Sequence, residues 1–366
     1  MVMADFYCYR SGAFIFRLWE SCNMATSTND KPDAFHADMK KANVGALWER
    51  HARPDDASRS EPAFRWPWGE VEPLIDQAVR ETGMDTAERR VIQMKNPAFP
   101  EPAVWATNNI NCGFQILMPG ERARPHRHTM NALRFVVEDG GGGGETIVDG
   151  KHCPMSPVDM IVTPAWTWHE HQHDGASRVI WLDVLDVPIV DHLGAAFFEP
   201  GGSNEYPDML PDSAFTSAGF APGRVPAGGH SPLFRYAWED SVEALQGMPQ
   251  AKDGSRQVRY VNPATGGSIM SLLDCYLLGL QKGQETEPYR TTSNAVCFVA
   301  EGEGVSTVGD KSISWGKNDV FSLPHWQWVT HEATTPDACL FVTTDREVLR
   351  RLELLWDEGD GAGGFH

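Results

Sequence analysis

The chain has 366 residues, of which 41% are hydrophobic and 22% charged, and its formal net charge is −19. This length accommodates two ordinary domains or one large one with ample core. The negative charge argues against binding to nucleic acid or to an anionic membrane. No apolar run approaches the roughly 18 residues of a membrane span, and seven scattered cysteines without a C-x-x-C pair are typical of a reduced compartment. We therefore expect a cytoplasmic protein with neither nucleic acid nor membrane as partner.

The first hundred residues divide into an extension and a helical region. Residues 1–32 are expected to be a poorly ordered extension, and Met24 resembles an ordinary start. Residues 33–100 are expected to hold an N-terminal helical region and a first strand. The predicted elements are a helix over 33–50 with Asp33 as its N-cap and Phe35, Met39, Ala42, Val44 and Leu47 as its apolar positions, a helix over 70–82, and a strand over 88–94.

Candidate metal ligands are concentrated in residues 101–190, which we expect to form a first β-barrel. His126 and His128 form a His-x-His pair, which places both imidazoles on one face of an extended strand. A third histidine on a later strand, His169, would complete a three-nitrogen site. Imidazole suits iron, zinc, copper or nickel, so these ligands alone do not select the metal.

Glycines frame the histidine pair in a recognisable way. Gly120 precedes His126 by six positions, and Gly140 follows the pair after an apolar run. This framing resembles the first motif of the cupin superfamily, a double-stranded β-barrel that holds its metal inside. The usual fourth ligand of that family, a glutamate four or five residues after the second histidine, is replaced here by Ala132 and Leu133. The resemblance therefore implies a neutral three-histidine site.

The rest of the chain predicts a connection, a second barrel and a final helix. Residues 191–254 are rich in Gly, Pro, Ser and Asp and predict a connection with one short helix over 239–245. Residues 255–344 predict a second β-rich barrel. Residues 345–366 predict a C-terminal helix and tail, with the helix over 345–358 and Val348, Leu349, Leu352, Leu355 and Trp356 facing inward.

An internal repeat relates the two β-rich regions. Residues 288–295 align with residues 125–132, and residues 323–331 align with residues 163–171. Asp159 is matched by Asp319 in the same alignment. The repeat predicts an all-β fold with helical additions, a bicupin made of two double-stranded β-barrel (jelly-roll) domains.

The repeat also sorts the histidines. Tyr289, Thr291 and Val329 stand at the positions of His126, His128 and His169, so the three candidate ligands are lost together in the second copy. His171, by contrast, is retained as His331 and is not assigned to the metal. We therefore predict one metal ion per chain, in the first barrel, and a second barrel without metal.

A divalent ion held by three neutral imidazoles keeps its full charge and open coordination positions. Such an ion suits a substrate that chelates through a carboxylate and a neighbouring phenolate, with room for O₂. Arg134 lies six residues after His128, an even spacing that places it on the ligand-bearing face of a regular strand. A guanidinium there could bind the substrate carboxylate through two hydrogen bonds. The alternative for Arg134 is an ion pair with an interior acid such as Asp183.

Several fragments together resemble the gentisate 1,2-dioxygenase group, which also contains salicylate and 1-hydroxy-2-naphthoate dioxygenases. The likeness covers roughly residues 33–357, and the fragments that support it most are residues 123–129, 132–138, 148–150 and 163–169. The resemblance implies one mononuclear Fe(II) per chain, a small aromatic acid and O₂ as substrates, and a homotetramer. It also implies ring cleavage between the carboxyl- and hydroxyl-bearing carbons of an ortho-hydroxybenzoate.

By matching position, the resemblance assigns roles to further residues. Arg90 and Arg134 would hold the substrate carboxylate, and His171 would bind the substrate or the oxygen intermediate and act in proton transfer. Gln115 and Asp183 would line or support the pocket, with the alternative that both only satisfy backbone groups. These roles are expectations that follow from the resemblance.

One position departs from the relatives and bears on the substrate. Many relatives have Leu-Trp-Ala or a near variant where this chain has Ile110-Asn111-Cys112. An amide at position 111 in place of an indole favours a polar ring substituent, so 5-aminosalicylate and 5-nitrosalicylate compete with gentisate as the expected substrate. The alternative activities are a 1-hydroxy-2-naphthoate dioxygenase, a metal cupin that acts as isomerase or decarboxylase, and a non-enzymatic bicupin that binds a ligand.

Overall fold

The computed structural model divides the chain into two units, residues 1–55 and residues 56–366. The structure describes residues 34–46, 61–84, 87–203, 205–206, 208–216, 222–223 and 230–359. Within these residues, no helix combines the length and the apolar character that crossing a bilayer requires.

The described part of the first unit contains one short helix, α2 (Ala34–Lys41). The prediction of a helix as far as residue 50 is wrong, because Asn43 adopts a left-handed backbone conformation with φ of 55°. The amide of Val44 then donates to the carbonyl of Met39 at 2.9 Å, which closes a Schellman-type C-cap. The side chain of Phe35 is exposed, while Asp33 and Leu47 lie outside the described residues.

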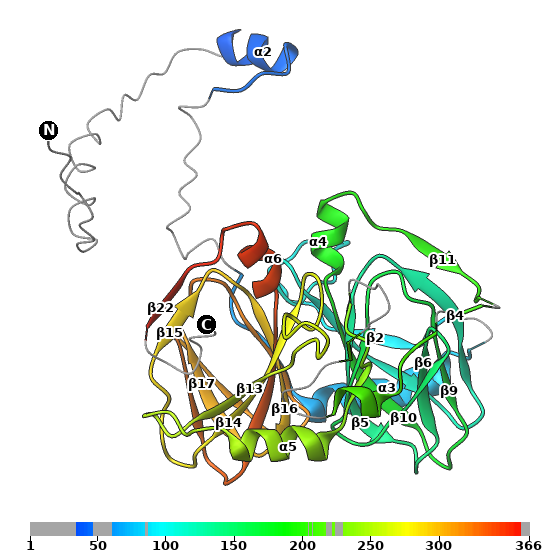
Figure 1. The fold of residues 1–366 in the computed structure, drawn as a ribbon. Coiled ribbons are helices and arrows are strands. Elements are labelled where there is room, and N and C mark those ends of the chain that lie inside the picture. Colours follow the sequence, from blue (N-terminus) through cyan, green and yellow to red (C-terminus); the bar gives the residue numbers. More distant parts are fainter. Residues whose placement is uncertain are drawn as a thin grey trace, which may run out of the picture. The chain divides into compact units, whose positions relative to one another are not determined.

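The second unit consists of two halves, each built from two antiparallel sheets (Figure 1). In the first half a six-stranded sheet has the order β12-β8-β5-β10-β3-β2, and a five-stranded sheet has the order β11-β4-β9-β6-β7. The strands are β2 (Val91–Gln93), β3 (Asn111–Leu117), β4 (Arg122–His128), β5 (Ala132–Asp139), β6 (Gly144–Val148), β7 (Lys151–Pro154), β8 (Met160–Thr163), β9 (His169–His173), β10 (Val179–Leu185), β11 (Phe198–Pro200) and β12 (Arg235–Tyr236).

The second half repeats this arrangement, with sheets ordered β1-β19-β16-β21-β14-β13 and β18-β17-β20-β15-β22. Its strands are β1 (Arg65–Trp66), β13 (Arg256–Arg259), β14 (Asp274–Leu280), β15 (Tyr289–Thr291), β16 (Ala295–Glu301), β17 (Gly304–Val308), β18 (Lys311–Trp315), β19 (Val320–Leu323), β20 (Val329–Ala333), β21 (Ala338–Thr344) and β22 (Asp357–Gly359). The predicted all-β bicupin with helical additions is confirmed.

The two six-stranded sheets pack against each other through aromatic side chains. The ring of Phe135 on β5 lies 4.5 Å from the ring of Phe341 on β21 and 5.7 Å from the ring of Phe298 on β16. Successive side chains of a strand point to opposite faces. Arg134 therefore points to the interior of the first half while its neighbour Phe135 belongs to the core between the halves.

Each half receives an edge strand from the chain segment that precedes the other half. β1 pairs with β19 of the second half, and β12 pairs with β8 of the first. The helix that follows each of these edge strands is capped by the aspartate that immediately precedes the paired strand. At the start of α3, Asp319 accepts a hydrogen bond from the Trp68 amide at 2.7 Å, and at the start of α5, Asp159 accepts one from the Trp238 amide at 2.9 Å. The matched aspartates of the repeat thus join the halves to each other.

The two capped helices follow the sequence prediction closely. α3 (Trp68–Glu81) was expected over 70–82, and α5 (Trp238–Gly247) was expected over 239–245. The buried Val71 and Ile75 of α3 face the first half. The strand predicted over 88–94 is shorter than expected, since β2 contains only Val91–Gln93.

At the opposite end of the unit, each half ends in a short helix followed by an arm (Figure 1). α4 (Val187–His192) leads to β11, and α6 (Arg346–Arg351) leads to β22. The predicted helix over 345–358 is therefore wrong beyond residue 351. Glu353 has a φ of 60°, which ends α6, and β22 then pairs with β15. Trp356, expected to face inward, is 65% exposed.

Candidate active site

The three predicted ligands come together inside the first half. His126 and His128 lie on β4, and His169 lies on β9 directly opposite His126 in the strand register. On β9 the histidines at 169, 171 and 173 are buried while the residues between them are half-buried, as strand alternation requires. One possible ligand atom from each of His126, His128 and His169 lies within 4.8 Å of the other two.

Backbone hydrogen bonds fix the orientation of all three rings. Their Nδ1 atoms lie 2.8 to 3.0 Å from the carbonyl oxygens of Arg124, Met130 and Thr167 respectively. When Nδ1 carries the proton and donates it to a carbonyl, Nε2 is left with the lone pair that a metal needs. Nε2 of His169 is buried and, within the described part of the chain, has no hydrogen-bond partner. This donor set fits a divalent metal ion.

The electrostatic surroundings keep these rings neutral. Burial, together with the charge of Arg89, lowers the pKa of His126 to about 3. Burial and the charge of Arg134 lower the pKa of His128 to about 4, and the same causes hold the pKa of His169 well below its usual value. Because metal ligation requires the neutral imidazole, the site is prepared for a cation at neutral pH.

A cavity of about 480 Å³ opens beside the histidines, and we call it the histidine pocket. His128 and His171 are part of its wall. The other residues that line it include the predicted Asn111, Gln115, Arg134 and Asp183, as well as Arg89, Val91, Gly113 and Phe198. The strands of the six-stranded sheet therefore supply Asn111, Gln115, Arg134 and Asp183, and the arm after α4 supplies part of its rim.

Arg134 forms the ion pair that the sequence offered as the alternative to substrate binding. Its Nε lies 2.9 Å from Oδ1 of Asp183, which is directly opposite on β10. Arg134 Nη1 also donates to the hydroxyl of Thr163. Burial raises the pKa of Asp183, and the charge of Arg134 opposes that shift. Both residues line the pocket, so Asp183 holds a guanidinium that still faces the cavity.

The structure does not bring Arg90 to the pocket. Its guanidinium binds the carboxylate of Glu121 through two hydrogen bonds of 3.0 and 2.8 Å, and its Nε donates to the carbonyl of Thr82. The neighbouring Arg89 lines the pocket instead, with Nη1 2.8 Å from Nε2 of His126. Consecutive side chains at the start of β2 point in opposite directions. The placement expected for Arg90 therefore belongs to Arg89.

His171 lines the pocket next to the three ligands without joining them. Its Nδ1 lies 3.0 Å from the hydroxyl of Thr146, and its ring centroid is 6.1 Å from that of His169. Nε2 is the ring nitrogen left for the pocket. Burial, with Arg134 as the next cause, holds the pKa of His171 well below its usual value.

Two amide side chains complete the polar part of the pocket. Asn111 lies on its wall and donates from Nδ2 to the carbonyl of Val104, which leaves its own carbonyl oxygen available. Nε2 of Gln115 is buried and has no hydrogen-bond partner among the residues that the structure describes. A buried donor of this kind is costly unless a ligand or water satisfies it.

The second half has no equivalent site among the residues that the structure describes. Tyr289 and Val329 face each other in the register where His126 and His169 do so in the first half. The space beside them, about 10 Å³, is too small for a substrate. The histidine cluster is the single group of three potential metal ligands found in the described residues.

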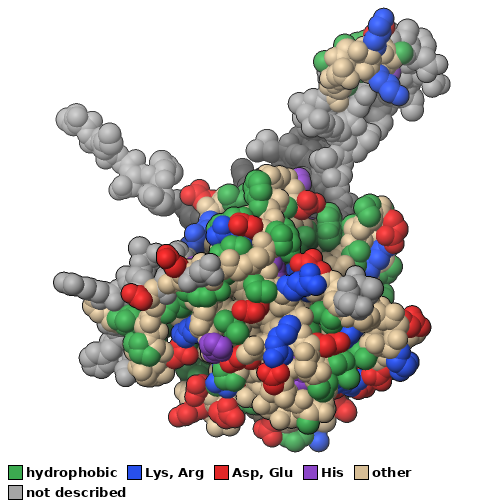
Figure 2. Space-filling model, turned by 90° about the vertical axis from the view of Figure 1, so that its right-hand side faces the viewer, with side chains coloured by type: hydrophobic (Ala, Val, Ile, Leu, Met, Phe, Trp, Pro, Cys, Tyr) green, Lys and Arg blue, Asp and Glu red, His purple; other side chains and the backbone are tan. Residues whose placement is uncertain are grey.

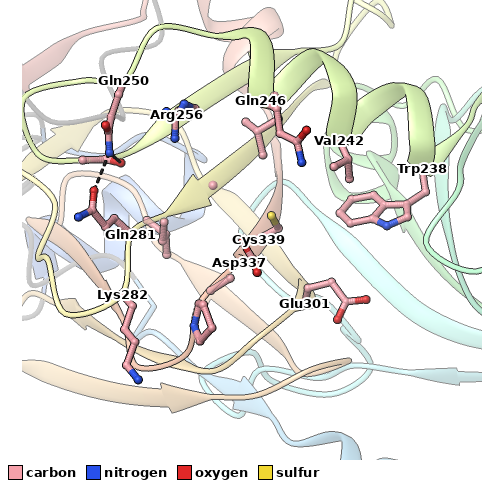
Figure 3. A pocket seen from close by; sticks show the side chains of 16 residues that line it. Trp238, Val242, Gln246, Gln250, Arg256, Gln281, Lys282, Glu301, Asp337 and Cys339 are labelled. Atoms are coloured by element: carbon pink, nitrogen blue, oxygen red, sulfur yellow. Dashed lines mark hydrogen bonds between the residues drawn. The ribbon is translucent and has the colours of Figure 1, made fainter.

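A larger cavity, about 850 Å³, lies elsewhere, between α5 and the outside of the second half (Figure 3). Trp238, Val242 and Gln246 approach it from the helix, Glu301 from the end of β16 and Asp337 from the turn before β21. In the first half the corresponding position is closed by Arg178, whose guanidinium binds Glu138 and Glu72 at 2.6 and 2.7 Å. No histidine lines the larger cavity, so we assign the chemistry to the histidine pocket.

The fold and the cluster together define a bicupin with one three-histidine centre. A cupin domain model matches residues 113–185, which span both histidine strands. The chain is 33% identical to a 5-aminosalicylate 1,2-dioxygenase of Comamonas sp, over 91% of this chain and 92% of the relative. It is 34% identical to a gentisate 1,2-dioxygenase of Ralstonia sp, over 90% of this chain and 95% of that relative.

Solved structures show the same relationship. A salicylate 1,2-dioxygenase of Pseudoaminobacter salicylatoxidans with gentisate superposes with a TM-score of 0.84 at 27% identity, over 93% of this chain and 98% of the other. The chain belongs to the gentisate and salicylate 1,2-dioxygenase family, whose members are metal-dependent, ring-cleaving enzymes.

Sequence reasoning missed several residues of the pocket, among them Arg89 and Phe198. Arg89 lies beside the predicted Arg90, and only the start of β2 at Val91 decides which of the two faces the cavity. Phe198 lies in a segment that was expected to be a connection. Its correspondence to Asp357 follows only from strand pairing, so the sequence repeat gave no signal for it.

Proposed function

We propose that this chain is an Fe(II)-dependent dioxygenase that opens the ring of an ortho-hydroxybenzoate between its carboxyl- and hydroxyl-bearing carbons. The substrates proposed are gentisate and salicylates with a polar 5-substituent, such as 5-amino- or 5-nitrosalicylate. The observation that supports this most is the convergence of three histidines, whose possible ligand atoms lie within 4.8 Å of one another, beside a pocket that also contains Arg89 and Arg134.

His126, His128 and His169 would hold one iron per chain. Fe(II) bound by three neutral ligands would supply the redox chemistry with O₂ and a positive charge for the carboxylate and phenolate oxygens of the substrate. Zinc and nickel also accept imidazole, so the choice of iron rests on the family. In the reaction one ring carbon–carbon bond breaks and both atoms of O₂ enter the ring-opened product.

The pocket residues would bind and orient the acid. The guanidiniums of Arg89 and Arg134 supply the positive charge that a carboxylate needs, and Asp183 holds Arg134 in place through their ion pair. His171, fixed at Nδ1 by Thr146, would hold or accept a proton at Nε2 next to the phenol oxygen. The unpartnered amide of Gln115 would donate to a substrate oxygen.

The polar wall at Asn111 is the reason for including 5-substituted salicylates. An amino or nitro group has hydrogen-bonding capacity that the Asn111 carbonyl and amide can match. A 1-hydroxy-2-naphthoate 1,2-dioxygenase of Nocardioides sp. (strain KP7) is also 34% identical, and its bicyclic substrate is the second candidate. We propose in addition a homotetramer in the cytoplasm, which light scattering and fractionation would test.

An oxygen-uptake screen tests the proposal directly. The full chain would be loaded anaerobically with Fe(II) and mixed with gentisate, salicylate, 5-amino- and 5-nitrosalicylate and 1-hydroxy-2-naphthoate. We expect stoichiometric O₂ uptake with at least one of the monocyclic acids and none in His126→Ala. If the chain loaded with Zn(II) or Mn(II) converted one of these acids to a product without consuming O₂, it would be an isomerase or a decarboxylase instead.

A further inference from the structure

Phe198 lies at the rim of the histidine pocket, on the short arm strand β11. Its ring stacks on the ring of His126, with centroids 5.4 Å apart and planes 24° apart. The guanidinium of Arg89 lies 5.2 Å from the centre of the same ring. The residue remains 43% exposed, so burial in a core does not explain its position. Nη1 of Arg89 is also only 2.8 Å from Nε2 of His126, so the two groups lie on the same side of the ring. The rest of the ring borders the pocket, where a planar ring can pack against it.

The second half provides an internal control for this position. Strand register pairs Phe198 with His128 on β4, and it pairs Asp357 with Thr291 on β15. Asp357 accepts two hydrogen bonds of 2.7 and 2.5 Å from the guanidinium of Arg346. The half without histidine ligands thus has a carboxylate where the half with them has an aromatic ring.

The arm itself is fastened in the same way in both halves. The guanidinium of Arg127 lies between Trp166 and Trp168, 4.4 and 4.5 Å from their ring centres, and binds Glu199 on β11 at 2.7 Å. In the second half Arg290 lies between Trp326 and Trp328 and binds Glu358 on β22. Since the fastening is retained without an aromatic ring at position 357, Phe198 is not needed to hold the arm.

We propose that Phe198 is a specificity-determining residue of the pocket. Its ring forms an aromatic side wall against which the ring of the bound acid packs, and it limits the width of the ring that enters. It thereby supplies the aromatic surface that Asn111 does not provide at its own position. Arg89, held over the same ring, points its charge toward the carboxylate of the acid. This inference rests on the proposed function.

Substrate binding measured without O₂ tests the role of Phe198 independently of turnover. The full chain, loaded anaerobically with Fe(II), would be titrated calorimetrically with gentisate and with 1-hydroxy-2-naphthoate, and its iron content would be measured. We expect Phe198→Ala to bind gentisate about two- to tenfold more weakly, which is the range of an aromatic contact. The dissociation constant for 1-hydroxy-2-naphthoate should fall relative to that for gentisate, because the pocket becomes wider. Phe198→Leu should lie between Phe198→Ala and the wild type.

Phe197→Ala is the matched control, because Phe197 precedes Phe198 on the arm, is 62% exposed and does not line the pocket. It should bind both acids as the wild type does. If Phe198→Ala bound both acids with wild-type dissociation constants, the proposal that Phe198 determines specificity would be wrong. A loss of iron in Phe198→Ala would also overturn it, because the ring would then only support His126. A wild-type chain that binds neither acid would overturn the proposed function as well.

Discussion

The two halves of the second unit are packed by the same kinds of contact, yet among the described residues only the first has a three-histidine cluster. In the first, the Asn131 side chain donates to Asp186 at 2.6 Å, and in the second, Asn294 donates to Asp345 at 2.8 Å. The arginine between two tryptophans and the helix cap on the other half's aspartate are also present twice. Residues that both halves keep are therefore those that fold and join the barrels.

The residues that differ between the halves form a set around the histidine pocket. The strand register places Leu278, Cys297 and Val342 where the first half has Gln115, Arg134 and Asp183. Tyr276 occupies the position of Gly113, where a side-chain carbon would come within 2.9 Å of the β2 backbone. The second half thus has apolar or larger side chains where the first half has histidines, polar groups and free space. The comparison distinguishes residues expected to act on a substrate from residues that pack the barrels.

The largest effect is expected at the ligands themselves. His169→Ala should abolish metal binding and reduce activity below detection, because two imidazoles leave the site without a third nitrogen. Val329→Ala at the equivalent position of the second half should change neither property, although removing buried methyl groups lowers stability by about 1–3 kcal/mol. Metal content per chain and O₂ uptake measure both. Full metal occupancy in His169→Ala would refute the ligand assignment.

His171 tests the comparison most severely, because both halves keep it. His331 binds the hydroxyl of Ser306 at 2.7 Å as His171 binds that of Thr146. If His171 also transfers a proton in the pocket, His171→Ala should retain iron, and its kcat should fall ten- to ten-thousand-fold, the usual range for loss of general acid–base catalysis. His331→Ala should lower only the free energy of unfolding. Equal effects of the two variants on kcat and stability would show that His171 is a packing residue.

The next effect separates two neighbouring arginines. Arg89→Lys keeps the charge but loses the planar two-point contact, so KM should rise by a factor that corresponds to about 1.5–3 kcal/mol. Arg90→Lys should leave KM unchanged and lower the denaturation midpoint, because the two-point bond to Glu121 is lost. Steady-state kinetics together with urea unfolding distinguish them. A rise in KM confined to Arg90→Lys would restore the assignment made from the sequence.

The histidine cluster could be predicted from the sequence because it depends on local spacing and on the repeat. His126 and His128 share a face by strand alternation, and the joint loss of three histidines in the second copy identified His169. The helices at 70–82 and 239–245 were equally local. By contrast, nothing local distinguishes Arg89 from Arg90, since their faces depend on where β2 begins.

The errors arose where distant pairing overrides local pattern. The spacing of apolar residues over 345–358 suits a helix, but pairing of β22 with β15 and the left-handed Glu353 end it at Arg351. Phe198 was hidden for the same reason, because β11 becomes a strand only through its pairing with β4. Such contacts connect residues about 70 positions apart, and no sequence window contains both partners.

The smallest predicted effect concerns Asn111, which lines the pocket and donates to Val104. Its counterpart Asp274 is buried and forms an ion pair with the half-buried Arg259 at 2.7 Å. Among the described residues, a polar group therefore stands here in both halves but faces the histidine pocket only in the first. One neutral hydrogen bond contributes about 0.5–1.5 kcal/mol. Asn111→Trp should therefore reduce kcat/KM for 5-amino- or 5-nitrosalicylate relative to gentisate by no more than about tenfold, because the indole removes the polar contact and adds aromatic area. Asp274→Asn, the matched change in the second half, should leave the substrate ranking unaltered. If Asn111→Trp also leaves it unaltered, the amide is a packing group in both halves, and the polar 5-substituent loses its structural basis while the ring-cleaving assignment is unaffected.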